Sequence, residues 1–145
     1  MTTSNTMKKV LVAGATGYLG KYVVKEFKKQ GYWVRALTRS SEKLASIREC
    51  IDDIIIGEVT KPASLQGICK DIDIVFSSIG ITKQKDGLTY KDVDYQANMN
   101  LLQEARKSGV KKYIYVSVLN GENLRHLKIC EAKERFVEQL QSSGI

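Results

Sequence analysis

Apolar residues gather in five short runs along the chain, and a stretch of mixed polarity separates each run from the next. The runs are rich in Val, Ile and aromatic residues and are too continuous for a sheet with one face in water. The pattern therefore predicts five buried parallel strands. They cover Lys8–Ala13, Trp33–Thr38, Asp53–Gly57, Ile72–Ser78 and Lys112–Val118.

The stretches between these runs have helical periodicity, with apolar residues three or four positions apart on one face. Gly31 and Gly109 follow two of these helices, Ser40 and Ser41 offer a cap for a short helix, and Pro62 suits the first turn of another small one. Strands that alternate with helices predict an α/β fold, a doubly wound parallel sheet in three αβα layers. The helical faces contain Leu19, Val23, Val24 and Phe27, then Ala97, Leu101, Leu102 and Ala105, then Ala132, Phe136, Val137 and Leu140.

Length and composition predict one globular domain over residues 1–145. The chain has 145 residues, of which 43% are hydrophobic and 27% charged, enough for a single core. No apolar run approaches the roughly 20 residues of a membrane span, and Met1–Thr6 lacks the apolar segment of a secretory signal. We therefore expect a cytoplasmic protein without a membrane partner.

Cysteine and histidine usage argues against a metal site. Cys50, Cys69 and Cys130 are odd in number and too widely spaced for paired ligands, so we expect three reduced thiols. His126 is the only histidine, which excludes a multi-histidine metal centre. A surface position for His126 is favoured over a catalytic one.

The net charge of +7 raises the question of nucleic acid. The lysines are mixed with acidic residues, and no basic run is interleaved with aromatic residues. We therefore expect no nucleic-acid partner. A basic surface also suits an anionic cofactor.

Three glycines stand between the first strand and the first helix, at Gly14, Gly17 and Gly20. Gly14 permits a tight exit from the strand, Gly17 leaves room where a diphosphate would approach the backbone, and Gly20 lets the helix pack closely on the sheet. The helix N-terminus offers free N–H groups and partial positive charge to phosphates. We expect a dinucleotide here, also contacting Thr16, Tyr18 and Leu19; the alternative is that the glycines serve only a tight turn.

The end of the second strand bears on the choice between NAD and NADP. NAD-selective sites place a carboxylate there for the ribose 2′-hydroxyl, whereas this strand runs into Arg39. Arg39, with Ser40 and Lys43 nearby, suits a 2′-phosphate and predicts preference for NADP(H) over NAD(H). In the alternative interpretation Arg39 is merely solvated and Glu42 reaches the ribose.

The other strand ends are assigned by the same geometry, because ligands of such sheets lie at the carboxyl ends of the strands. Glu58 and Val59 are expected to flank the adenine. Ser77, Ser78, Ile79 and Gly80 are expected beside the ribose and nicotinamide. The polar stretch Thr82–Val93 is either a mobile flap over this site or an ordinary surface loop.

These stretches resemble the short-chain dehydrogenase/reductase superfamily, in its extended and atypical branches, which include NAD-dependent epimerase/dehydratase-like and NmrA-like proteins. The resemblance implies a Rossmann fold with NAD(P) across the strand ends. Members of this type continue into a C-terminal lobe that supplies the substrate pocket, so we expect the chain to be an N-terminal portion of a longer protein. The resemblance rests on KKVLVAGATGYLGKYVVKEFKKQGYWVRALTRS, GEVTKPASLQGICKDIDIVFSSIG, VDYQANMNLLQEARKSGVKKYIYVSV and CEAKERFVEQLQSSG.

The superfamily also implies catalytic positions: a Ser or Thr after the fifth strand, and a Tyr four residues before a Lys. Ser117 and Lys133 match, but Ile129 stands where the tyrosine belongs. Isoleucine carries no ionisable proton. Lys133 is expected to hold the nicotinamide ribose or to act as a base; the alternative is a surface lysine.

Two functions remain open at this point. One is hydride transfer between NADPH and an unknown small organic substrate. The other is a non-catalytic, dinucleotide-binding redox sensor or scaffold, which the missing tyrosine favours. The helix Val93–Ser108 and the helix after Glu122 pair subunits in many relatives, so a homodimer is possible.

Overall fold

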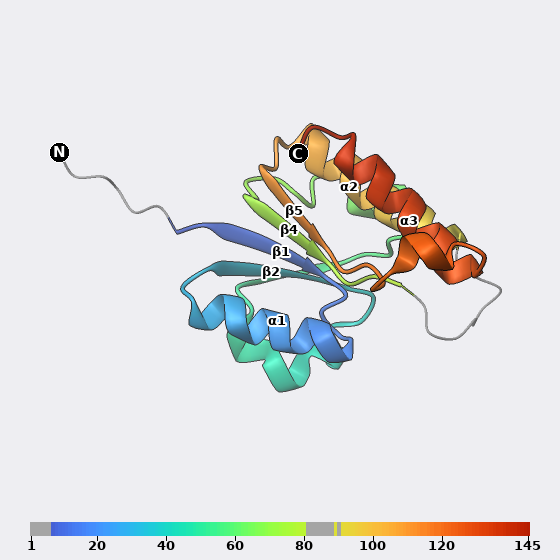
Figure 1. Cartoon of the computed structure of the whole chain (residues 1–145). Helices are drawn as coiled ribbons and strands as arrows, with labels where there is room; N and C mark the ends of the chain where they lie inside the picture. Colours follow the sequence, from blue (N-terminus) through green and yellow to red (C-terminus); the bar gives the residue numbers. More distant parts are fainter. Residues whose placement is uncertain (1–6, 81–88, 90) are drawn as a thin grey trace.

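The sheet has five strands, all parallel, in the order β3-β2-β1-β4-β5. The computed structural model describes residues 7–80, 89 and 91–145 (Figure 1). The central strand β1 therefore separates β2 and β3 from β4 and β5. The strands are β1 Lys9–Ala13, β2 Trp33–Thr38, β3 Asp53–Ile56, β4 Ile74–Ser77 and β5 Lys112–Tyr115.

Helices cover both faces of the sheet, so that the molecule has three layers (Figure 1). The helix α1 and a 3₁₀ helix lie on one face, and α2 and α3 lie on the other. The predicted doubly wound α/β fold is confirmed. The helices are α1 Tyr18–Lys29, the 3₁₀ helix Ser41–Cys50, a 3₁₀ turn Pro62–Leu65, a π-helical stretch Lys91–Ala97 that continues into α2 Asn98–Lys107, a 3₁₀ turn Gly121–Leu124 and α3 Lys128–Gln141.

Each face of the sheet has its own apolar core, as alternation of side chains along a strand requires. On β1, Val10 and Val12 face α1, and Leu11 and Ala13 face α2. All four are fully buried. Their contacts across the sheet fix β1 at the centre of the fold.

The strand positions were predicted well, but two interpretations need correction. The edge strands β3 and β5 are only partly buried: Ile56 is 57% and Ile114 is 38% exposed, because each edge strand has one neighbour. The predicted fifth strand is also too long. It ends at Tyr115 because β4 ends at Ser77, whose carbonyl accepts the last bond, from the N–H of Val116.

The predicted short helix after Ser40 is a 3₁₀ helix, and Ser40 occupies its N-cap position without a side-chain capping bond. Instead the Thr38 hydroxyl donates to the Ser40 carbonyl at 2.8 Å. Residues 82–88 and 90 of the predicted flap or loop lie outside the described residues. In the described part of the chain, no helix combines the length and apolar composition of a bilayer-spanning segment.

Candidate functional site

The glycine loop connects β1 to α1 at the carboxyl end of the central strand. Gly14 has φ +89°, and its carbonyl accepts a bond from the N–H of Gly17 at 3.1 Å. The first helical bond then runs from the N–H of Lys21 to the Gly17 carbonyl. The first-turn N–H groups of an α-helix have no acceptor within the helix, so α1 presents donors and partial positive charge at this point.

The three glycines differ in what the fold demands of them. A Cβ on Gly20 would lie 1.9 Å from the Gly14 carbonyl oxygen, and a Cβ on Gly14 would lie 2.5 Å from Ser78 Oγ. A Cβ on Gly17 would be 3.4 Å from its nearest neighbour, and Gly17 has an ordinary extended backbone, with φ −77° and ψ 170°. The fold therefore requires glycine at two positions, whereas glycine at position 17 suits a cradle into which a ligand group fits.

A cavity of about 660 Å³ opens beside this loop, across the carboxyl ends of the strands. Cofactor sites commonly have volumes of about 300–1,000 Å³. The cavity spans the switch point between β1 and β4, where doubly wound sheets bind ligands. Its lining consists of Gly14, Thr16, Gly17, Tyr18, Leu19, Leu37, Thr38, Arg39, Gly57, Glu58, Val59, Thr60, Ser78, Ile79, Gly80 and Val116.

Most of the predicted cofactor-binding residues line this cavity, but five predicted site residues do not. Gly20 packs against the Gly14 backbone, and Ser40 lies just beyond the lining residue Arg39. Ser77 is fully buried behind the cavity wall. Ser117 and Lys133 lie on the α3 side of the sheet, where Ser117 Oγ donates to Glu134 Oε1 at 3.4 Å.

Sequence reasoning missed several lining residues, all of them at strand ends or just beyond. Leu37 and Thr38 precede Arg39, Gly57 and Thr60 bracket the predicted Glu58–Val59 pair, and Val116 follows β5. Their nearness to predicted strand ends could have identified them, since each is within a few residues of such an end. Which of these side chains face the cavity depends on the register between neighbouring strands.

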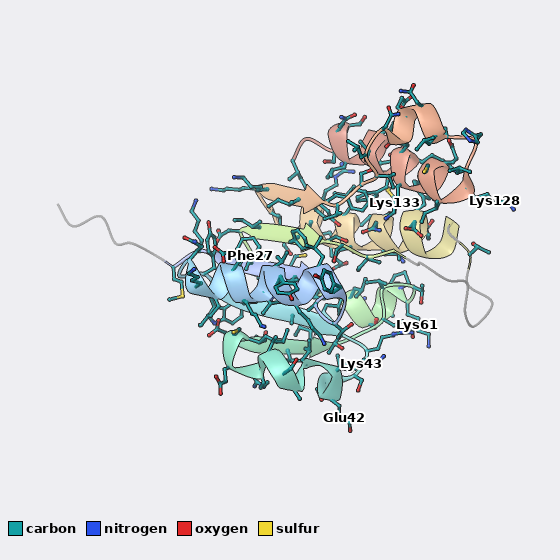
Figure 2. The ribbon with its side chains drawn as sticks, turned by 60° about the horizontal axis from the view of Figure 1, so that its bottom comes forward. Phe27, Glu42, Lys43, Lys61, Lys128 and Lys133 are labelled. Atoms are coloured by element: carbon teal, nitrogen blue, oxygen red, sulfur yellow. The ribbon has the colours of Figure 1, made fainter. Side chains whose placement is uncertain are left out.

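Charged side chains surround the end of the cavity formed by β2 and β3. Arg39 is exposed and makes no hydrogen bond or ion pair within the described residues. Glu58 accepts from the Thr60 hydroxyl at 3.1 Å and pairs with Lys61 at 3.3 Å. The Lys61 and Thr60 contacts, and then the charge of Arg39, hold the pKa of Glu58 below its usual value. Glu42 projects outward from the 3₁₀ helix (Figure 2).

Two buried asparagines of α2 fix the loops that follow β3 and β4. Asn98 Oδ1 accepts from Ser77 Oγ at 2.6 Å, and Asn98 Nδ2 donates to the Ile79 carbonyl at 3.2 Å. Asn100 Nδ2 donates to the Val59 carbonyl at 2.9 Å. These long-range bonds hold the segments after β3 and β4 in place and satisfy polar groups that burial would otherwise penalise.

Lys133 pairs with a carboxylate that the sequence reasoning did not identify. Lys133 Nζ lies 3.0 Å from Asp94 Oδ1; the Asp94 side chain is fully buried and that of Lys133 is 13% exposed. The ammonium also lies 5.5 Å from the ring centroid of Tyr115. Burial raises the pKa of Tyr115, and the nearby charges of Asp94 and Glu134 act in the same direction.

The remaining candidate residues do not line the cavity. Cys50, Cys69 and Cys130 are free thiols, and burial raises the pKa of Cys69 to about 12. His126 is exposed. No group of three or more His, Cys, Asp or Glu side chains within the described residues could hold a metal ion.

The parallel sheet, the glycine loop at the start of α1 and the cavity at the switch point together define a dinucleotide-binding domain of Rossmann type. A family model described as NAD(P)H-binding matches residues 14–144. The chain belongs to this family, which confirms the prediction that its cofactor is a nicotinamide dinucleotide. The residue-level roles stay predictions.

Known proteins of several functions are similar to this chain. The photosystem II assembly factor Ycf39 of Synechocystis is 32% identical over 90% of this chain and 41% of its own length. The chloroplastic divinyl chlorophyllide a 8-vinyl-reductase of Zea mays is 31% identical over 93% of this chain and 36% of its own length. This chain therefore spans less than half of either relative.

Among solved structures, a putative NAD-dependent epimerase/dehydratase from Bacillus halodurans superposes with a TM-score of 0.79. It is 26% identical, and the match covers 95% of this chain and 66% of the other. This likeness agrees with the predicted resemblance to epimerase/dehydratase-like proteins.

Proposed function

We propose that this chain binds NADP(H) in preference to NAD(H). The observation that carries the proposal is Arg39, which lines the cavity at the end of β2, is exposed, and makes no ion pair within the described part of the chain. A guanidinium binds a phosphate through two charge-assisted hydrogen bonds. No carboxylate follows β2 directly, and Glu42, the alternative partner of the ribose, projects outward (Figure 2).

The lining residues suit the parts of the dinucleotide in order along the cavity. The backbone around Gly17 would bind the pyrophosphate, and Glu58 and Val59 would flank the adenine. Ser78 to Gly80 would border the nicotinamide half. The volume of about 660 Å³ and the absence of a side chain at Gly17 both fit a ligand of this size.

For activity we infer hydride transfer to a small organic substrate, with the nicotinamide supplying the hydride and the protein supplying orientation and electrostatics. Lys133 and Ser117 are the candidate polar groups, and neither lines the cavity itself. The similarity to a plant vinyl-reductase supports a reductase.

A second candidate is a dinucleotide-binding protein without catalysis, acting in assembly or as a redox sensor. Ile129 favours it, because the first turn of α3 has no ionisable group where the superfamily places its tyrosine. The similarity to photosystem II assembly factors also supports it.

Calorimetric titration with NADPH and NADH tests the cofactor proposal. We expect tighter binding of NADPH, and Arg39→Asp should remove the difference between the two. Lys111→Asp is the matched control, because it makes the same change in net charge at an exposed position just before β5, at the opposite edge of the sheet. Equal affinity of the unaltered protein for both dinucleotides would contradict the proposed preference.

Deuterium transfer separates the two candidate activities. NADPH carrying deuterium at C4 of the nicotinamide is incubated with a panel of enones and carbonyl compounds. A reductase incorporates the label into the product, and Lys133→Ala should slow this step. Tight NADPH binding without incorporation for any member of the panel would favour the assembly or sensor function.

A further inference from the structure

A buried ion pair lies directly behind the cavity wall, on the side of β4. Asp94 belongs to the π-helical stretch that leads into α2, and Lys133 belongs to α3. Figure 2 shows Lys133 between the ribbons of these two helices, whereas Lys128 projects from the outer end of α3. The pair therefore joins the segment that leads into α2 to α3.

Gly80 is the wall residue in contact with this pair. A Cβ at position 80 would lie 2.5 Å from Asp94 Oδ1 and 2.9 Å from Lys133 Nζ. Gly80 itself lines the cavity. The missing side chain at position 80 thus lets the ammonium and the carboxylate approach the part of the cavity that is assigned to the nicotinamide half.

Stability alone is a weak reason for this arrangement. Removing two charges from water costs free energy that their attraction often only offsets, and well-packed apolar residues can replace such pairs without loss. The Asp94 carboxylate is fully buried, and its charge is paired with the Lys133 ammonium. A charge pair kept at the edge of a ligand cavity is more readily explained by the ligand.

We propose that Asp94 is a positioning residue, which holds the Lys133 ammonium behind Gly80 so that this ammonium meets the nicotinamide ribose of a bound dinucleotide. This inference rests on the proposed dinucleotide binding. Asp94 acts through Lys133 and does not itself touch the ligand. The Tyr115 ring, 5.5 Å from the ammonium, is a second group that restricts the positions of Lys133.

The alternative hypothesis, that the ion pair only stabilises the fold, predicts a different pattern of ligand affinities. If the pair only ties α3 to the start of α2, its loss would loosen the whole cavity and weaken every ligand alike. If it positions Lys133, its loss affects only ligands that carry the nicotinamide half. NADPH and 2′,5′-ADP separate these possibilities, since 2′,5′-ADP contains the adenosine and the 2′-phosphate but no nicotinamide.

Calorimetric titration of Asp94→Asn with both ligands is the test. We expect NADPH to bind about tenfold more weakly, the loss expected for one charge-assisted hydrogen bond, and 2′,5′-ADP to bind as before. Lys133→Met should behave in the same way, and the double variant should be no worse than Lys133→Met alone, because Asp94 acts only through the lysine. Lys128→Met, which removes an exposed lysine from the same helix, should change neither affinity.

Gly80→Ala tests the same pair without removing either charge, should Asp94→Asn fail to fold. Its Cβ would displace the pair, so the affinity for NADPH should again fall while the affinity for 2′,5′-ADP stays the same. Equal weakening of both ligands, unchanged NADPH binding in Asp94→Asn, or additive losses in the double variant would each overturn the positioning role. Failure of the unaltered protein to bind either ligand would instead overturn the proposed dinucleotide binding, and the inference with it.

Discussion

The two sides of the cavity are built by different means. Where β1 leads into α1, the wall is formed by the glycine loop and the first turn of α1, which short-range backbone hydrogen bonds hold in place. The segments after β3 and β4 are instead held by buried polar side chains, most of them from α2, whose partners are distant in the sequence. Ser77 bonds to Asn98, 21 residues away, and Asn100 bonds to the Val59 carbonyl, 41 residues away.

A backbone-built wall is a local property of the chain, since glycine spacing and helix geometry suffice to specify it. A wall held by side chains requires partners that only the complete fold brings together. Substitutions on the first side should therefore act through steric fit. Substitutions on the second side should act through unsatisfied polar groups.

The largest effect is expected at Gly20. In Gly20→Ala the new Cβ meets the Gly14 backbone at 1.9 Å, and neither chain segment has a flexible end that could move aside. The free energy of unfolding should fall by about 3 kcal/mol or more, at the upper end of overpacking effects, as measured by urea denaturation. Gly31→Ala is the control: it has positive φ but meets no atom within 4 Å, so its loss should be about 1 kcal/mol. Similar losses in the two variants would refute the steric explanation.

Asn98→Ala should have the next largest effect. It removes the partner of Ser77 Oγ and of the Ile79 carbonyl, both in buried surroundings. An unsatisfied buried polar group costs about 1–3 kcal/mol, so the free energy of unfolding should fall by about 2 kcal/mol. Gln103→Ala, exposed on the same helix, should change it by less than about 0.5 kcal/mol. A stable Asn98→Ala would mean that the second wall does not depend on its side chains.

Gly17→Ala should leave the fold intact and weaken the binding of NADPH. Its Cβ contacts only the Gly14 carbonyl oxygen, at 3.4 Å, and its backbone angles suit alanine. We expect the free energy of unfolding to stay within about 0.5 kcal/mol, while NADPH affinity falls by about tenfold or more, equivalent to about 1.4 kcal/mol. Unchanged affinity in a folded variant would show that no ligand group approaches position 17.

The smallest expected effect is on the pH dependence of the free energy of unfolding, and it comes from the Asp52 carboxylate. Burial opposes its ionisation, but the bonds from the Val34 N–H, at 2.8 Å, and from Lys28 Nζ, at 2.9 Å, outweigh that effect and lower the pKa of Asp52 below 3.8. A carboxyl whose pKa is lower in the folded state stabilises the fold above its unfolded pKa, and this stabilisation is lost as pH falls through the folded value.

Asp52→Asn should therefore reduce the free energy of unfolding by about 1 kcal/mol at neutral pH. The difference from the unaltered protein should shrink as the pH falls below 3.8. Urea denaturation across this range is the measurement. A difference that is constant with pH would exclude the carboxylate as its source.

Much of the fold and most of the residues that line the cavity can be predicted from the pattern of residues. The run Val10–Val12 and the spacing of Gly14, Gly17 and Gly20 locate the central strand, the loop and the first helix, because each depends only on near neighbours in the chain. Arg39 lines the cavity because it directly follows a strand of the parallel sheet, and its contact with a ligand stays a prediction.

The sequence by itself thus determined the alternation of strands and helices, the glycine loop and the approximate positions of the strand ends that border the cavity, because hydrophobic periodicity and glycine conformation act locally. Only the tertiary structure decided where the edge strands end, which of their isoleucines stay exposed, and that Asp94 meets Lys133 behind Gly80. Strand length depends on the neighbouring strand, and a buried charge requires a partner from a distant segment. Both depend on contacts between segments that are far apart in the sequence, so no single segment of the sequence predicts them.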